Sequence, residues 1–306
     1  MKTQLSKVLI LLLSTTCLSA NAAFSLSNYQ LTSSYVIPKA SASEVSAVTW
    51  NWDTDTLFVV GDGATSVLEI NKQGQALSSM SITGFADTEG LTYIGGNQFV
   101  IAEERLQDVS LFTYVAGGSV ARSGVSSLSI GPTIGNIGIE GISYDRLSGN
   151  YITVKEKTPQ AVYGTSLSFA NSTISVSNLF DPISLGVGDL SDVQALSNFT
   201  SLIGTSQQDN LLIYSQESAR LLEVTRSGQV LSSINLGSID ANIEGVTIDS
   251  NGVIYLVNDV AGTNASPNFL YVLTTPVPEP QTHALMLAGL MFIVAISRRS
   301  YKKVNH

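Results

Sequence analysis

Hydrophobic and polar positions in the middle of the chain follow one phrase that returns about every fifty residues. Each copy starts with a glutamate or a serine and, in most cases, continues into the β-branched and aromatic residues that are typical of a strand. The five copies are Ser46-Ala-Val-Thr-Trp50, Glu89-Gly-Leu-Thr-Tyr93, Glu140-Gly-Ile-Ser-Tyr144, Ser191-Asp-Val-Gln-Ala195 and Glu244-Gly-Val-Thr-Ile248. A fixed period of this length predicts a propeller or another repeat architecture.

Further strands follow each phrase, separated by turns rich in Asp, Asn and Gly, which accept the backbone angles of tight turns. Second strands are predicted at residues 56–60, 98–102, 150–154, 211–214 and 253–257. Third strands are predicted at residues 66–70, 110–114, 161–164, 220–224 and 268–272. No long amphipathic helix pattern interrupts them. The sequence therefore predicts an all-β fold, a single five-bladed β-propeller of four-stranded blades. The last repeat ends after its third strand, and residues 26–37 are predicted to supply its outer strand, which would close the ring.

The two ends of the 306-residue chain differ from its middle. Residues 1–22 carry Lys2 and Lys7, an apolar run at 8–13 and Ala20-Asn-Ala22, which predicts a secretory signal peptide cut by signal peptidase. Cys17 is the only cysteine of the chain and lies in this segment. The mature protein is therefore expected to have no disulfide framework.

The C-terminal segment, residues 276–306, contains Val277-Pro-Glu-Pro280, an apolar run at 284–296 and a basic end with Arg298, Arg299, Lys302 and Lys303. With its flanking residues the run just reaches the length of a membrane span, so a transmembrane helix is predicted at about 284–297 with a cytoplasmic basic tail. This arrangement resembles the PEP-CTERM sorting signal of Gram-negative bacteria. The resemblance implies that an exosortase cuts near 277–280 and removes the helix. An ordinary C-terminal anchor is the alternative.

The middle segment, residues 23–275, is strongly acidic. All 24 Asp and Glu and nine of the 15 Lys and Arg lie between residues 23 and 280, a formal net charge of −15 for that stretch. Such a surface repels nucleic acid phosphates and favours cation binding. A nucleic-acid partner is therefore not expected.

Several stretches of this middle segment resemble the SdiA-regulated family, over residues 28–273. They are residues 48–60, 84–93, 99–105, 155–159 and 215–224. The resemblance implies a five-bladed propeller, distantly similar to NHL repeats, with a calcium site and no established activity. Residues 198–208 depart from the repeat and are predicted to form a surface loop.

Histidine and cysteine are missing from the middle segment, because the two histidines are His283 and His306. Ser-His-Asp and Cys-His catalysis are therefore excluded, as are typical zinc sites. The segment also has no P-loop and no G-x-S-x-G motif. Carboxylates, hydroxyls and amides remain as the groups that can carry chemistry.

The first residue of each phrase is expected to face the central channel, because first strands line the channel of a propeller. Glu89, Glu140 and Glu244 would then converge, and alternation along a strand would place Glu44 and Asp189 beside Ser46 and Ser191. Close carboxylates repel each other unless a cation or protons neutralise them, and oxygen ligands favour a hard cation over zinc. We therefore predict a metal site, for which the family resemblance implies calcium. The alternative for each glutamate is a structural role at a strand end.

A second acidic set follows the second strands, and here solvated or paired loop charges are predicted instead of ligands. Its members are Asp62, Glu103, Glu104, Glu156, Glu217 and Asp259. The aromatic residues Trp50, Trp52 and Tyr93 are predicted to belong to the blade core.

Two functions are compatible with these features. The first is an exported, calcium-binding propeller that acts as a binding or scaffold protein of the cell envelope or extracellular matrix, with extracellular polysaccharide or an envelope protein as partner. It would be held transiently in the inner membrane by its C-terminal helix and then reach the cell surface or the medium. The second is a calcium-dependent hydrolase, similar to a lactonase or a phosphoesterase, that uses the channel carboxylates. The sequence contains no acid–base pair apart from the predicted metal ligands, so it does not establish an enzyme.

Overall fold

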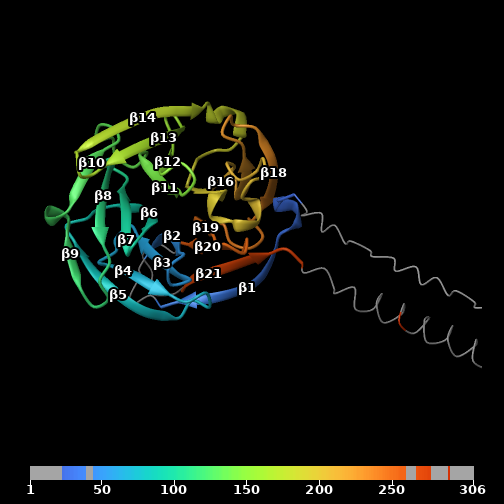
Figure 1. Ribbon diagram of the computed structural model, residues 1–306, viewed down its shortest axis with the longest axis horizontal. Helices are drawn as coiled ribbons and strands as arrows, with labels where there is room; N and C mark the ends of the chain where they lie inside the picture. Colours follow the sequence, from blue (N-terminus) through green and yellow to red (C-terminus); the bar gives the residue numbers. More distant parts are fainter. Residues whose placement is uncertain (1–22, 39–43, 260–266, 277–288, 290–306) are drawn as a thin grey trace, which may run out of the picture.

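The computed structural model describes residues 23–38, 44–259, 267–276 and 289. The first three ranges form a closed ring of five mainly antiparallel sheets around a central axis (Figure 1). The predicted signal peptide, with Cys17, lies outside the described residues. So does the predicted sorting signal from residue 277 onward, apart from Gly289. Within the described residues, no helix has the length and apolar character needed to cross a membrane.

The blades follow one another along the chain, each with its first strand at the axis and its later strands further out. Blades 1 and 2 are β2 (Val45–Asn51), β3 (Thr56–Gly61), β4 (Ser66–Ile70) and β5 (Ala76–Thr83), then β6 (Thr88–Gly95), β7 (Gln98–Glu103), β8 (Asp108–Thr113) and β10 (Ser126–Ser129). Blades 3 and 4 are β11 (Ile139–Asp145), β12 (Asn150–Lys155), β13 (Ala161–Ser168) and β14 (Thr173–Phe180), then β15 (Asp192–Ala195), β16 (Leu211–Ser215), β17 (Arg220–Val224) and β18 (Val230–Asn235). Blade 5 consists of β19 (Ile243–Ile248), β20 (Ile254–Asn258), β21 (Asn268–Thr274) and β1 (Gln30–Ile37). The five-bladed, four-stranded architecture predicted from the sequence is thus confirmed.

The outer strands show two connections that matter for closure. β1 runs antiparallel to β21, with Gln30 opposite Thr274 and Ile37 opposite Asn268, so both ends of the domain share one sheet. β9 (Ser119–Ala121) adds a fifth strand to blade 1, parallel to β5, before the chain returns to blade 2. The sequence pattern did not predict this link between two blades.

Apolar side chains pack between neighbouring blades. The interface of blades 1 and 2 is mainly aromatic, with Phe58 and Phe99 at a ring distance of 4.6 Å. Trp50 and Tyr93 are 3% and 1% exposed, which confirms their predicted place in the core. Trp52 is only partly buried, and its ring lies between Tyr93 and the guanidinium of Arg146, 4.4 Å away.

The insertion in blade 4 is more than a surface loop. It folds into the short 3-10 helices η4 (Leu196–Asn198) and η5 (Thr200–Leu202), and Leu202 is 4% exposed. The Gln207 side chain accepts a hydrogen bond from Phe24 N at 2.9 Å and donates one to Phe24 O at 2.8 Å. The insertion therefore holds the N-terminal segment against blade 4.

Candidate metal centre

The first residue of the repeated phrase is an unpaired bulge residue in four blades. Cα pairing between first and second strands skips one residue between Val45 and Ala47, Thr88 and Gly90, Ile139 and Gly141, and Ile243 and Gly245. The skipped residues are Ser46, Glu89, Glu140 and Glu244. A β-bulge re-aims the side chain of its extra residue. These side chains accordingly face the axis.

The glycine after each ring glutamate is required by the close approach of the next blade. A Cβ on Gly141 would lie 2.7 Å from Asp192 Cα, and one on Gly245 would lie 2.7 Å from Ser46 O. The Glu-Gly pair therefore has a physical reason: the glutamate faces the axis while its neighbour lets two first strands pack closely.

Beneath the ring residues, the fourth position of the phrase ties the blades together through side-chain oxygens. The hydrogen bonds run from Tyr93 N to Thr49 Oγ1, from Tyr144 N to Thr92 Oγ1, from Ala195 N to Ser143 Oγ and from Trp50 N to Thr247 Oγ1, at 2.8–3.2 Å. Blade 4 carries Gln194 at this position, and its Oε1 accepts from Thr247 Oγ1 at 2.9 Å. All five side chains are buried. They hold the first strands in register below the ring residues.

Second strands end beside the ring residues, so acids from both sets meet in one cavity of about 190 Å³. Its carboxylates are Asp62, Glu89, Glu104, Glu140, Glu156, Asp189, Glu244 and Asp259. Asn136, Gln216 and the hydroxyls of Ser46 and Ser191 complete the lining. The cavity is thus almost wholly polar and acidic.

Two groups of three carboxylates lie close enough to share a cation. They are Asp62, Asp87 and Glu89, at the junction of blades 1 and 2, and Glu104, Glu140 and Glu156, at the junction of blades 2 and 3. In each group one oxygen of every member lies within 4.8 Å of the others. Three members of the second acidic set, which was predicted to be solvated or paired, belong to these groups: Asp62, Glu104 and Glu156. Glu156 is also paired with Lys157, as that prediction allowed. Asp87 was not singled out in the sequence, although it stands two residues before Glu89, as Glu44 and Asp189 stand two residues before Ser46 and Ser191.

The same prediction holds for Glu103 and Glu217. Glu103 Oε2 lies 2.6 Å from Arg122 Nε, and Glu217 Oε1 lies 2.7 Å from Lys157 Nζ. Neither carboxylate lines the cavity.

The crowding of carboxylates perturbs their proton affinities. Burial raises the pKa of Glu140 well above its usual range, and the neighbouring Glu89 raises it further. Burial also raises the pKa of Glu89, with Glu244 as the next cause. For Glu244 itself, burial and then Asp259 raise the pKa from 4.5 to about 8. The cavity therefore disfavours negative charge unless protons or a cation neutralise it.

The five predicted ligands are not equivalent in the structure. Glu140 and Glu89 belong to the two clusters, one to each, and Glu244 lines the cavity while its Oε1 accepts a hydrogen bond from Gln216 Nε2 at 2.7 Å. Asp189 also lines it, but its carboxylate accepts hydrogen bonds from Ser191, Ser215 and the amide of Glu217.

Glu44 is not among the residues that line the cavity. It has a φ of 51°, and one of its carboxylate oxygens lies next to Gly63. The alternation that placed Glu44 beside Ser46 therefore does not bring its carboxylate into the cavity lining.

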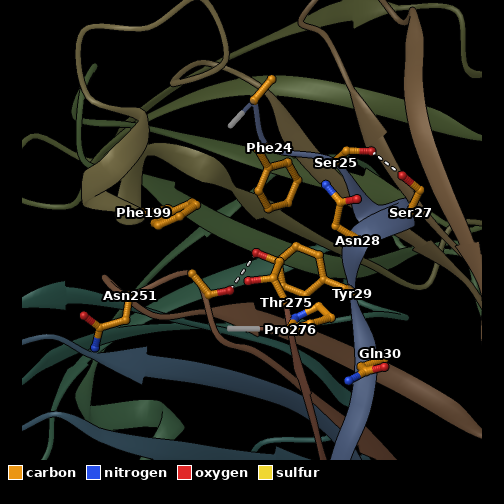
Figure 2. A pocket seen from close by; sticks show the side chains of 12 residues that line it. Phe24, Ser25, Ser27, Asn28, Tyr29, Gln30, Phe199, Asn251, Thr275 and Pro276 are labelled. Carbon is orange, nitrogen blue, oxygen red and sulfur yellow. Dashed lines mark hydrogen bonds between the residues drawn. The ribbon is translucent and has the colours of Figure 1, made fainter. Parts of the chain in front are cut away.

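A larger cavity, of about 600 Å³, lies where the N-terminal segment meets blades 4 and 5. Figure 2 shows Phe24, Tyr29 and Phe199 around it, and the Tyr29 hydroxyl donates to Gly252 O at 2.7 Å. No charged side chain lines this space among the described residues. It offers no carboxylate for a cation, so the acidic cavity is the candidate site.

Comparison with known proteins agrees with the fold and identifies the family. The model of the SdiA-regulated family matches residues 21–274. The chain belongs to the SdiA-regulated family. Among solved structures, glutaminyl cyclase of Myxococcus xanthus superposes with a TM-score of 0.54 at 9% identity, covering 81% of this chain and 97% of that one. A luciferin-regenerating enzyme has a TM-score of 0.48 at 13% identity, covering 79% of this chain and 95% of that one. At these identities the likeness concerns the propeller fold alone.

Proposed function

We propose that this SdiA-regulated family member binds calcium at the axial mouth of its propeller. The observation that carries the proposal is the convergence of eight carboxylates from all five blades on one cavity. The ring glutamates and the acids that end the second strands both contribute. The cluster of Glu104, Glu140 and Glu156 offers three carboxylates in one place.

The geometry of this cluster suits a hard cation. Calcium binds oxygen ligands at about 2.3–2.6 Å, so two oxygens on opposite sides of the ion are about 5 Å apart at most. The oxygens of the cluster lie within 4.8 Å of one another, which is compatible with that spacing. Oxygen is the only ligand type available, since the described residues contain neither histidine nor cysteine.

Calcium would supply the positive charge that the cavity lacks, and the protein's own groups would position it. Gln216 holds the Glu244 carboxylate, and Gly138 N donates to Glu104 Oε1 at 3.0 Å. Lys157 Nζ lies 2.7 Å from Glu156 Oε1 and from Glu217 Oε1. The carboxylates are thus held in place before the cation binds, which lowers the entropic cost of binding.

Calcium titration calorimetry on the purified protein tests the proposal, together with melting curves with and without a chelator. Binding is expected, with a melting temperature that falls in the chelator. Glu140→Gln should weaken binding strongly, whereas Asp209→Asn, an exposed acid far from the mouth, should not. If no calcium binds and the chelator leaves melting unchanged, the proposal is wrong.

The broader role that we propose is an exported binding or scaffold protein of the envelope or extracellular matrix, which recognises polysaccharide or an envelope protein. A calcium-dependent hydrolase is the alternative, and lactone and phosphoester substrates distinguish the two. Turnover that disappears in the Glu140→Gln variant would establish the enzyme. No turnover, together with calcium binding, would support the binding protein.

Export and processing by signal peptidase and an exosortase are part of the same proposal. They rest on the sequence features of both ends, which lie outside the described residues. Mass spectrometry of the native protein is expected to find an N-terminus near Ala23 and a C-terminus near residues 277–280. A C-terminus at His306 would contradict the processing.

A further inference from the structure

We infer that the mouth binds two calcium ions, the second held by Asp62, Asp87 and Glu89. This inference rests on the proposed calcium function and goes beyond it. The second cluster shares no residue with Glu104, Glu140 and Glu156. It also lies at a different junction of blades, so one ion placed among the first three carboxylates does not replace a ligand of the other three.

The environment of Asp87 also points to a ligand, apart from the number of acids in the cluster. Its side chain is 2% exposed, and neither of its carboxylate oxygens accepts a hydrogen bond within the described part of the chain. Arg105 provides an ion pair, with Nε 2.9 Å from Asp87 Oδ2, but this side chain is half exposed. A buried carboxylate is costly unless it is fully compensated. Asp87 therefore retains coordinating capacity directed at Asp62 and Glu89.

Two carboxylates that line the cavity, Asp189 and Glu244, are better supplied with hydrogen-bond donors. Asp189 accepts hydrogen bonds from two hydroxyls and an amide, and Glu244 accepts one from the Gln216 side chain. By contrast, only Arg105 brings a positive charge to the Asp87 cluster among the ion pairs of the described residues.

Formal charges agree with two divalent ions. The two clusters together hold six carboxylates. Arg105 pairs with Asp87, and Lys157 pairs with Glu156. Because Lys157 is shared with Glu217, at least four negative charges remain when the clusters are ionised, which is more than one calcium ion neutralises. Because repulsion between close carboxylates is strong away from bulk water, the remaining charge favours a second ion.

The number of ions bound by the full-length protein tests this inference. Titration calorimetry with calcium chloride, and metal analysis after equilibrium dialysis, should give two calcium ions per chain. Asp87→Asn should remove one of them and leave the other, and Glu104→Gln should do the same for the neighbouring site. Asp108→Asn serves as the control, since Asp108 is an ion-paired aspartate on the same blade that does not line the cavity.

Arg105→Gln gives a readout that a merely structural role of the cluster would not produce. Because Arg105 is the built-in positive charge next to Asp87, its loss should tighten one of the two binding events several-fold. If Asp87→Asn fails to fold, as judged by its melting curve, Asp62→Asn replaces it.

Two results would overturn the inference in different ways. A stoichiometry of one, with Asp87→Asn and Glu104→Gln weakening the same event, would leave the proposed calcium function intact and refute the second site. A stoichiometry of zero would refute both. Two anomalous peaks at the mouth in crystals grown with calcium would support the inference.

Discussion

Glu244 offers the sharpest test of the electrostatic argument, because its substitution should have opposite effects with and without calcium. Burial and Asp259 raise the pKa of this carboxyl from 4.5 to about 8 in the cation-free protein. Between these two values the folded chain holds a proton that the unfolded chain releases. The free energy of unfolding must therefore fall as the pH rises from about 4.5 to 8.

The size of the effect follows from that displacement. Each tenfold change in proton affinity corresponds to about 1.4 kcal/mol, so a charged Glu244 costs the cation-free fold up to about 5 kcal/mol above pH 8. Glu244→Gln removes this cost and still offers Gln216 an acceptor oxygen. In a chelator the variant should therefore melt above the wild type at pH 9 and close to it at pH 4.5.

In calcium the order should reverse, because the variant has lost a negative charge from the cavity that binds the cation. Thermal unfolding followed by circular dichroism at both pH values, in chelator and in calcium, measures all four cases. Asp209→Asn removes the same charge from an exposed site and should change none of them by more than about 0.5 kcal/mol. A Glu244→Gln variant that is destabilised equally in chelator and in calcium would refute the reasoning.

Three further substitutions test how the ring is held together, each by denaturant unfolding. Gly141→Ala places a Cβ 2.7 Å from the backbone of the next blade and should cost about 2 kcal/mol or more, whereas Gly124→Ala, with open space around it, should be nearly neutral. Thr92→Val removes the hydroxyl that accepts an amide of blade 3 at 2.8 Å and should cost about 1–2 kcal/mol; no loss would mean that this bond does not stabilise the ring. Lys72→Met leaves the buried Asp249 without its ion pair at 2.8 Å and should cost about 2–3 kcal/mol, with much of it recovered in Lys72→Arg.

The propeller fold could be predicted from the sequence because the patterns that indicate it are local and repeated. Strand periodicity, turn residues and the fifty-residue period each depend on neighbours along the chain. They predicted the five blades and the inward position of Glu89, Glu140 and Glu244. The same local signals could not predict β9, since its parallel pairing with β5 joins segments that only the closed ring brings together.

The candidate site was predicted only in part. The acid two residues before the ring residue joins a cluster as Asp87 and lines the cavity as Asp189, but Glu44 does not line the cavity. Spacing along the chain is the same in all three blades, so it does not distinguish them.

The sequence by itself determined the fold class, the number of blades, the absence of histidine and cysteine chemistry in the middle segment, and the acidic character of the channel. Only the tertiary structure decided which carboxylates meet. Asp62, Asp87 and Glu89 come from two blades, and so do Glu104, Glu140 and Glu156. Distances between blades depend on how the ring closes around the axis, and that closure is set by packing between strands that lie far apart in the chain.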